Sequence, residues 1–511
     1  MNPSENTTIC APATPVGAGA VSLLRVSGPL AIETADKVVR FKKGCASQAP
    51  GYSLHFGSIS ETDGALLDEV LVSVFRAPHS YTGEDMVEIC CHASGYIVER
   101  ILSLLCKAGA SPAEPGEFTR RAFLNGKMDL SQAEAVADLI ASSSRSAHDL
   151  AIRQMKGGYS EELGKMRDKL LHLVSLMELE LDFSEEEVEF ADRSELMTLL
   201  DEAIERFRSL ADSFRVGNAL KNGIPTAIAG APNSGKSTLL NALTGQDRAI
   251  VSDIAGTTRD TIEESCQADG ILFRFIDTAG LRDSTDTIER LGIERSWKEI
   301  GNAQAILAVL DLSRCDEELM ESASDILRGC RTHSDSASPT PSVHGASPFM
   351  CFLLNKADLE RSSKRIDTIR QRLVKLAPES KTLVLALHPK AASSAFSSDS
   401  SLSSDSDTPL SDANGTYPLH TVADIKALLA SHFRTLASGH ETLVSNFRHA
   451  EALRSASEAL IRTREGLLQG LPTDLCCQDI REALHHLGSI TGQITSQDVL
   501  NNIFSRFCIG K

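Results

Sequence analysis

Residues 230–237 read Gly230-Ala231-Pro232-Asn233-Ser234-Gly235-Lys236-Ser237, which matches the pattern G-x-x-x-x-G-K-[ST]. The apolar run 226–229 precedes them and the helix-compatible run 238–243 follows, so a glycine loop joins a strand to a helix. Backbone N–H groups of such a loop surround a phosphate, while Lys236 adds positive charge and Ser237 offers a hydroxyl to Mg²⁺. An ordinary glycine turn is the alternative that this motif alone leaves open.

Two further motifs each follow a predicted strand. The strand 271–276 precedes Asp277-Thr278-Ala279-Gly280, and the strand 349–354 precedes Asn355-Lys356-Ala357-Asp358. Asp277 can hold Mg²⁺ through water, Gly280 can offer its N–H to a γ-phosphate, and Asp358 can accept from the two donor nitrogens of guanine. Because nucleotides bind at the carboxyl ends of the strands of an α/β sheet, the three motifs in this order predict a Ras-like GTP-binding domain.

The catalytic group of this domain is not given by these three motifs. Leu281 stands where Ras-type proteins place the glutamine that orients the attacking water, and an aliphatic side chain cannot do this. The candidates in the following turns are Arg282, Asp283, Asp286 and Glu289. The earlier loop 252–260 contains threonines that can ligate Mg²⁺ when a γ-phosphate is present, which predicts a switch segment.

Composition limits the class of protein. The chain has 511 residues and a formal net charge of −18, which predicts about three domains and argues against a protein that coats nucleic acid. It has no apolar stretch of membrane-spanning length, and its first residues lack the basic and apolar regions of a signal peptide. The 12 cysteines show no C-x-x-C pair, so we expect reduced thiols in a cytoplasmic protein without a membrane anchor.

Residues 1–117 are expected to form an α+β domain. Its expected strands include 21–26, 70–75 and 86–92. Strand geometry places Glu88 and His92 on one face of the last of these strands, opposite Val87 and Ile89. Spacing alone favours the interpretation that the polar side chains of this face are solvated rather than functional.

Helical periodicity replaces the strand pattern after residue 117 and returns near residue 438. The sequence Ser131-Gln132-Ala133-Glu134 matches a capping box at the start of one helix. We therefore expect one helical domain, formed by 118–215 and 438–511, that is interrupted by a GTPase domain at 216–437. Two Ser-rich segments of the GTPase domain are expected to be disordered surface insertions. These segments are 332–347 and 391–414.

Over nearly its full length the sequence resembles the MnmE/TrmE family of tRNA-modifying GTPases. The motifs that carry the resemblance are Ala13-Thr14-Pro15, Leu24-Arg25-Val26-Ser27-Gly28, Tyr81-Thr82-Gly83-Glu84-Asp85, Pro115-Gly116-Glu117-Phe118, Arg121-Ala122-Phe123-Leu124-Asn125-Gly126-Lys127, Gly256-Thr257-Thr258-Arg259-Asp260, Asp277-Thr278-Ala279-Gly280-Leu281-Arg282 and Phe507-Cys508-Ile509-Gly510-Lys511. Many GTPases share the central motifs, whereas their combination with both flanks is specific to this family. The resemblance implies a multidomain α/β and α+β fold with an N-terminal folate-binding and dimerisation domain.

The resemblance also implies roles for individual residues. Those expected to bind GTP are Asn233, Ser234, Gly235, Lys236, Ser237, Thr238, Ser252, Asp253, Ile254, Ala255, Gly256, Thr257, Thr258, Asp277, Thr278, Ala279, Gly280, Asn355, Lys356 and Asp358. A K⁺ ion is expected to bind the side chains of Asn233 and Thr257 and the backbone of Ser252 and Ile254, and Mg²⁺ is expected to bind Ser237 and Thr258. A fixed cation beside the phosphates can stabilise transition-state charge as an arginine finger would.

A second group of implied residues serves folate binding and catalysis. The expected contacts of 5-formyltetrahydrofolate or methylenetetrahydrofolate are Arg25, Glu88, Lys127 and Lys511. The expected catalytic residues are Glu289, which positions the attacking water, Arg282 and Cys508. For Cys508, packing of an apolar tail is an open alternative to thiol chemistry.

Partners and reaction are likewise implied by the family. Its members form homodimers through the N-terminal domain and heterotetramers with an FAD-dependent MnmG-type partner. Together these proteins add an aminomethyl or carboxymethylaminomethyl group to carbon 5 of the wobble uridine of certain tRNAs, using a folate one-carbon unit and K⁺-activated GTP hydrolysis. Two stretches, 92–95 and 387–390, depart from the family pattern at the folate pocket and at the guanine pocket.

Two hypotheses of other classes compete with this one. A ribosome-assembly GTPase would share the central domain but should carry a basic RNA-binding domain, which this acidic sequence does not indicate. A structural switch that uses GTP only to dimerise would bind no folate. The folate-type motifs at both ends of the chain favour the tRNA-modifying enzyme.

Overall fold

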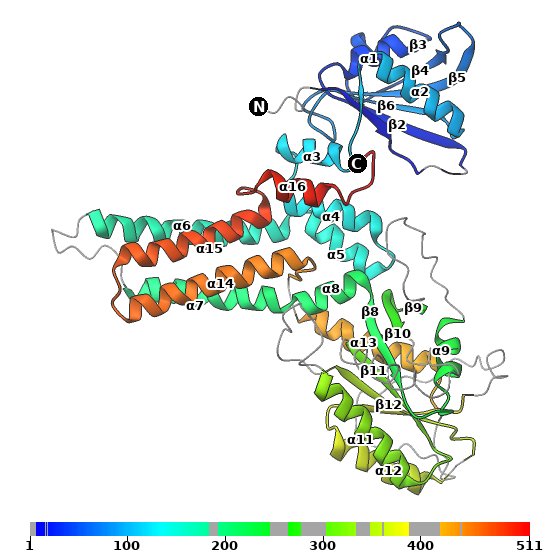
Figure 1. Cartoon of the computed structure of the whole chain (residues 1–511), viewed down its shortest axis with the longest axis vertical. Helices are drawn as coiled ribbons and strands as arrows, with labels where there is room; N and C mark the ends of the chain where they lie inside the picture. The colour runs from blue at the N-terminus through cyan, green and yellow to red at the C-terminus, as the bar shows by residue number, and fades with distance from the viewer. Residues whose placement is uncertain are drawn as a thin grey trace, which may run out of the picture. The chain divides into compact units, whose positions relative to one another are not determined.

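The computed structural model describes residues 7–15, 17, 19–182, 193–245, 264–276, 303–333, 348–359, 362–387, 419–439 and 442–511. The chain forms two compact units (Figure 1). The first consists of Met1–Ile140, Ala151–Ile204 and Ser455–Lys511. The second consists of Ala141–Leu150 and Glu205–Arg454. The predicted domain limits near 117, 215 and 437 stay predictions, because these units follow spatial contact rather than function.

A sheet of seven strands opens the first unit. Its strands are β1 (Ile9–Pro12), β2 (Val21–Ser27), β3 (Val39–Phe41), β4 (Ser53–Ser60), β5 (Leu66–Phe75), β6 (Met86–His92) and β7 (Ser111–Pro112). Their spatial order is β3-β4-β5-β6-β2-β1-β7, with a parallel pair only between β1 and β7 among the described residues. Helices α1 (Ala31–Val38) and α2 (Gly95–Lys107) bury one face of this sheet, and the 3₁₀ turn η2 (Ala46–Gln48) packs beside α1.

The alternation predicted for β6 is confirmed. Val87 and Ile89 are fully buried under the helices, whereas Glu88 and His92 point to the other face of the sheet. The cross-strand register sets Glu88 opposite Arg25 of β2. The open face of the sheet therefore brings together two charged side chains that are far apart in the sequence.

The rest of the first unit is helical. Its elements are α3 (Glu117–Leu124), α4 (Leu130–Ala141), α5 (Arg145–Met155), α6 (Gly158–Asp182), α7 (Arg193–Asp212), α14 (Phe447–Leu468), α15 (Thr473–Thr491) and α16 (Gln497–Phe504), of which α4, α5, α7 and α14 extend into the second unit. Figure 1 shows α6 alongside α15 and α7 alongside α14. An ion pair of Glu178 with Arg481 joins α6 to α15, and an ion pair of Asp201 with Arg464 joins α7 to α14. The prediction that helices from both ends of the chain form one domain is confirmed.

The predicted capping box of α4 is wrong by two residues. The helix begins at Leu130, so Ser131 already lies inside it and is buried. Asp129 and Gln132 form the reciprocal pair instead, since Oδ1 of Asp129 accepts from the Gln132 N–H and Oε1 of Gln132 accepts from the Asp129 N–H, both at 2.9 Å. A carboxylate is at least as good an N-cap as a serine hydroxyl, which explains why the earlier residue caps the helix.

The second unit holds a six-stranded sheet with the order β13-β12-β11-β8-β10-β9. Its strands are β8 (Ile224–Ala229), β9 (Glu264–Ala268), β10 (Ile271–Ile276), β11 (Ala305–Asp311), β12 (Phe349–Asn355) and β13 (Lys381–Val384). Among the described strands of this sheet, only the edge strand β9 pairs antiparallel. One face packs on α8 (Phe214–Asn222), α9 (Lys236–Thr244) and α13 (Val422–Ser438), and the other on α11 (Asp316–His333) and α12 (Ser363–Leu376). This two-sided covering explains the uninterrupted apolar runs of the parallel strands.

Two sequence expectations in this unit need correction or stay open. The apolar runs 303–312 and 382–387 predict two strands, but β11 spans only Ala305–Asp311 and β13 ends at Val384. After Val384 the Leu387 N–H donates to the side chain of Asn355 instead of to a neighbouring strand. Helix α11 extends to His333, so the first two residues of the predicted insertion 332–347 are helical. The remainder of that segment and the segment 391–414 lie outside the described residues.

Candidate functional site

The glycine loop joins β8 to α9, as predicted. Gly235 caps the helix with a φ of 105°, and a Cβ at this position would lie 2.3 Å from Nδ2 of Asn355. Only glycine fits there, because its backbone is left-handed and a side-chain amide occupies the space that a Cβ would need. Ser237 and Thr238 lie in the first turn of α9, where free N–H groups and the helix dipole favour an anion.

Lys236 is held in place by the loop itself. Its Nζ donates to the carbonyl oxygens of Gly230 at 2.9 Å and Ala231 at 3.0 Å. The ammonium therefore lies over the loop whose backbone N–H groups are predicted to bind phosphate. This arrangement matches a phosphate site that binds the anion through backbone dipoles and one point charge.

Asn355 connects this loop to the predicted guanine motif. The side chain is only 1% exposed, and its Nδ2 donates to the Ser234 carbonyl at 2.9 Å. Its Oδ1 accepts from the Leu387 N–H at 3.1 Å. The same residue thus fixes the position of the glycine loop and that of the segment that follows β13.

We expect Asn355→Ala to lower the free energy of unfolding of the second unit by about 2–3 kcal/mol, since it leaves one buried and one half-buried backbone group without their partners. GDP affinity should fall as well, because the glycine loop loses its tether. Urea unfolding and calorimetric GDP titration measure the two effects. The matched control is Asn222→Ala, whose amide bonds Asn218 on the exposed surface and whose loss should cost under 0.5 kcal/mol. Equal stability losses in the two variants would contradict the role given to Asn355.

Asp311 was missed by the sequence analysis. It ends β11 at the same sheet edge, and its Oδ2 accepts from Nζ of Lys356 at 2.7 Å, while Ser313 donates to its Oδ1. Burial acts to raise the pKa of the Asp311 carboxyl, but the hydrogen bonds from Lys356 and Ser313 outweigh it and hold this pKa below its usual range. The sequence feature that could have indicated Asp311 is an aspartate at the carboxyl end of a continuous apolar run, where a buried strand ends.

Several predicted nucleotide residues lie outside the described part of the chain. They are Ser252, Asp253, Ile254, Ala255, Gly256, Thr257, Thr258, Asp277, Thr278, Ala279, Gly280, Arg282 and Glu289. Their roles stay predictions. Within the described part, the structure brings the glycine loop, Asn355 and Lys356 to one edge of the sheet, and Asp358 follows them as a half-buried residue.

A second candidate site lies on the open face of the N-terminal sheet. Nε and Nη2 of Arg25 donate to Oε1 of Glu88 at 3.0 and 2.8 Å, and Nη1 donates to the Gly510 carbonyl at 3.3 Å. The guanidinium carbon also stands 5.2 Å from the ring centre of Tyr81 and 5.6 Å from that of Phe118. Such contacts with aromatic faces stabilise a cation that is mostly removed from water.

The C-terminal segment docks beside this site. The Gly116 N–H donates to the Cys508 carbonyl at 3.4 Å, and a Cβ on Gly510 would stand 2.1 Å from the Pro12 carbonyl oxygen. Burial, and then the nearby charge of Arg25, lower the pKa of the Lys511 ammonium. The structure thus brings three of the four predicted folate residues, Arg25, Glu88 and Lys511, to one place.

Two residues of this region behave differently. Lys127 is exposed, and its Nζ donates to the Pro78 carbonyl at 3.0 Å rather than to the Arg25–Glu88 pair. Cys508 is also exposed, whereas Phe504 and Phe507 are buried against α4. Phe504 and Phe507 of the apolar tail therefore pack, whereas Ile509 is 57% exposed and the thiol of Cys508 remains accessible.

The described residues limit other kinds of site. Their helices include none that is long and apolar enough to cross a membrane. They also contain no cluster of three or more His, Cys, Asp or Glu side chains suited to a metal ion. All 12 cysteines are free thiols.

Comparisons with known proteins give two matching family models and relatives that match over nearly the full length. A family model described as "MnmE helical domain" matches residues 130–508, and one described as "GTP-binding protein TrmE N-terminus" matches residues 8–127. A tRNA modification GTPase MnmE from Bacteroides fragilis is 44% identical over 506 residues, which covers 99% of this chain and 99% of that protein. The protein of the same description from Parabacteroides distasonis is 45% identical over 513 residues, with 99% and 100% covered.

Similarity to solved structures is weaker. A GTP-binding protein from Sulfolobus solfataricus in complex with GDP is 14% identical, with 54% of this chain and 73% of that chain covered, and the TM-score of 0.25 is too low to support an argument. The chain belongs to the MnmE family of tRNA modification GTPases.

Proposed function

We propose that this GTPase acts in the cytoplasm with an FAD-dependent partner to modify carbon 5 of the wobble uridine of certain tRNAs. It would add an aminomethyl or carboxymethylaminomethyl group, with 5-formyl- or methylenetetrahydrofolate as the one-carbon source. The observation that carries this proposal is the meeting of Arg25, Glu88 and the 508–511 segment in a chain that also has a phosphate loop. A nucleotide switch alone has no need of the first of these sites.

The donor set of the N-terminal site fits a folate. Glu88 uses Oε1 for Arg25, and the described residues give no hydrogen bond to its Oε2. The free oxygen can accept from the adjacent N–H donors of a pterin ring, which form a pair that a carboxylate suits well. Arg25 and Lys511 supply positive charge for the acidic tail of the same molecule.

The nucleotide site fits GTP with Mg²⁺ and K⁺. Ser237 is exposed in the first turn of α9, where a hydroxyl can reach a Mg²⁺ ion between the phosphates. Asn233 is exposed in the glycine loop with a φ of 61°, and its amide oxygen is free to serve a monovalent cation. These ions would neutralise charge that develops during hydrolysis, while Lys236 holds the terminal phosphates in place.

The exposed apolar side chains of the N-terminal sheet support the proposal of a homodimer. Leu54, Phe56 and Leu71 are 63%, 43% and 42% exposed, and Phe56 stands directly opposite Leu71 on the neighbouring strand. The cross-strand register places Ser73, beside Leu54, opposite Glu88, and Glu88 opposite Arg25. The apolar patch and the folate site therefore share one face of the sheet. Apolar patches of this kind on a sheet commonly mark an interface.

We expect Phe56→Glu to convert the dimer into a monomer at micromolar concentration, since it places a charge in the centre of the apolar patch. Sedimentation velocity of the full chain gives the oligomeric state. Val374→Glu, at an equally exposed apolar position of α12, is the matched control and should sediment as the unaltered chain does. A Phe56→Glu chain that remains dimeric would show that another surface holds the dimer.

The whole proposal is tested by mass spectrometry of tRNA nucleosides from cells with and without this protein. The carbon-5 aminomethyl-type wobble uridine should appear only when the protein is present, and Glu289→Ala should not restore it. An unchanged nucleoside profile together with intact GTP hydrolysis would overturn the proposal. It would leave the ribosome-assembly GTPase or the structural switch.

A further inference from the structure

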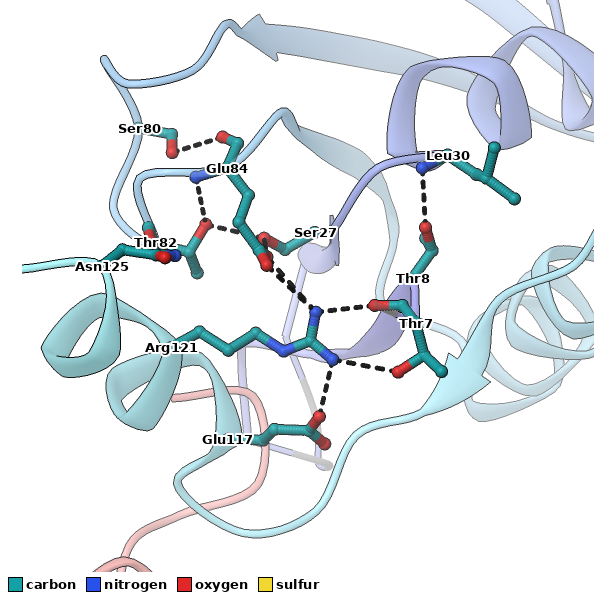
Figure 2. A network of polar contacts seen from close by, with 10 residues as sticks. All are labelled: Thr7, Thr8, Ser27, Leu30, Ser80, Thr82, Glu84, Glu117, Arg121 and Asn125. Carbon is teal, nitrogen blue, oxygen red and sulfur yellow. Dashed lines mark hydrogen bonds and ion pairs between the residues drawn. The ribbon is translucent and has the colours of Figure 1, made fainter. Parts of the chain in front are cut away.

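A buried arginine lies beside the folate site without touching it. Arg121 of α3 has a side chain only 7% exposed, yet it makes two ion pairs (Figure 2). Its Nη1 donates to both carboxylate oxygens of Glu84 at 3.3 Å, and its Nη2 donates to Glu117 at 2.8 Å. The same two nitrogens also donate to the carbonyl and the hydroxyl of Thr7.

Glu84 connects Arg121 to the loop between β5 and β6. Its Oε2 accepts from the Ser27 hydroxyl at 2.8 Å, and its backbone carbonyl accepts from the Ser80 hydroxyl. Its backbone N–H donates to the Thr82 hydroxyl, which in turn bonds the Ser27 hydroxyl at 2.7 Å. The residues on both sides of Tyr81 are therefore fixed by one connected network, which Figure 2 shows.

Tyr81 is also held from α3. Its hydroxyl bonds Thr119 at 2.9 Å, and its ring packs with Phe118 in one small apolar cluster. Both partners stand on the same helix as Arg121, within three residues of it. The rings of Tyr81 and Phe118 are the two aromatic groups that the Arg25 guanidinium approaches.

The geometry points to a positioning role for Arg121 in the folate site, an inference that rests on the function proposed above. By pairing with Glu84 and Glu117, Arg121 fixes the 80–85 loop against α3. Tyr81 and Phe118 are then placed to hold Arg25 in line with Glu88. Arginine suits this position because its planar guanidinium can donate to two carboxylates and a carbonyl at once. A lysine ammonium is a single point charge and cannot reach all three.

The test is calorimetric titration of the full chain with 5-formyltetrahydrofolate. Arg121→Lys keeps the charge but lacks the fork, and we expect it to raise the dissociation constant at least tenfold at unchanged stoichiometry. Glu84→Gln should do the same. The double variant should be no worse than the stronger single one, because both changes break one shared network.

A matched control separates positioning from stability. Arg100 pairs with Glu61 in the same sheet domain, with Nε 2.8 Å from Oε1, but on a part of it away from the Arg121 network. Arg100→Lys should leave the folate dissociation constant unchanged. Irreversible misfolding in any variant lowers the stoichiometry without raising the dissociation constant. Reversible unfolding raises the apparent dissociation constant instead, and a thermal unfolding scan at the titration conditions detects it.

Two results would overturn this inference and leave the proposed function standing. One is an Arg121→Lys chain that binds 5-formyltetrahydrofolate as tightly as the unaltered chain, and the other is an equal weakening in Arg100→Lys. Failure of the unaltered chain to bind this folate would overturn the proposed function and this inference together. Titration of the unaltered chain alone reveals this failure, before any variant is measured.

Discussion

Lys236→Ala is expected to lower GTP affinity by about 100-fold or more and to reduce hydrolysis below detection at ordinary nucleotide concentrations. Lys236 stands over the glycine loop, held by the carbonyls of Gly230 and Ala231. A charge-assisted hydrogen bond contributes about 1.5–3 kcal/mol, and 1.4 kcal/mol corresponds to a tenfold change in affinity. Loss of the ammonium, which serves two phosphate groups, therefore lowers GTP affinity by a factor of about 100 or more.

The loss should come from binding and not from unfolding. Lys236 is half-buried, and the carbonyls of Gly230 and Ala231 that accept from it belong to a loop, where water can satisfy them once the ammonium is gone. Thermal unfolding of Lys236→Ala should therefore stay close to that of the unaltered chain. Lys364→Ala, at an exposed position in the first turn of α12, provides the matched control for charge removal.

Calorimetric titration with GDP and with a slowly hydrolysed GTP analogue measures this prediction. The effect should be larger for the triphosphate than for the diphosphate, because Lys236 serves the terminal phosphates. Equal affinities in Lys236→Ala and Lys364→Ala would mean that the loop does not bind the phosphates through this residue.

The nucleotide domain could be predicted well from the sequence because its signals are local. The strand expected at 271–276 is β10, and the strand expected at 349–354 is β12 extended by one residue. Parallel strands that are buried on both faces leave continuous apolar runs, and the motifs stand where these runs end. The strands expected at 303–312 and 382–387 were both predicted too long, since β11 spans Ala305–Asp311 and β13 ends at Val384. After β13 the side chain of Asn355, and not a neighbouring strand, accepts from the Leu387 N–H.

The folate site could not be derived from local signals in the same way. Arg25 and Gly510 are separated by 485 residues, and no periodicity relates a strand of the first domain to the last turn of the chain. Spacing alone favoured a solvated Glu88, and only the family resemblance indicated a function. The supporting residues Tyr81, Phe118 and Arg121 stood in quoted motifs without a role, because burial and ring contacts are properties of the folded chain.

Glu88→Gln is expected to raise the dissociation constant of 5-formyltetrahydrofolate by about 100-fold while leaving GDP affinity unchanged. The substitution preserves the shape of the side chain but removes its charge, so Arg25 loses its only ion pair among the described residues. It also replaces one acceptor oxygen by an NH₂ donor, which cannot pair with the N–H groups of a pterin. Two charge-assisted hydrogen bonds at about 1.5 kcal/mol or more each account for this size.

Glu69→Gln distinguishes this effect from a general change of charge on the open face. Glu69 stands on β5 of the same sheet and is exposed, so the same chemical substitution there should change folate affinity less than twofold. Arg25→Gln should resemble Glu88→Gln, and the double variant should lose less than the sum of the two, since each single change already breaks their shared ion pair. Additive losses would instead mean that Arg25 and Glu88 contact the folate independently, and that the ion pair seen in the unliganded chain is exchanged for separate contacts when the folate binds.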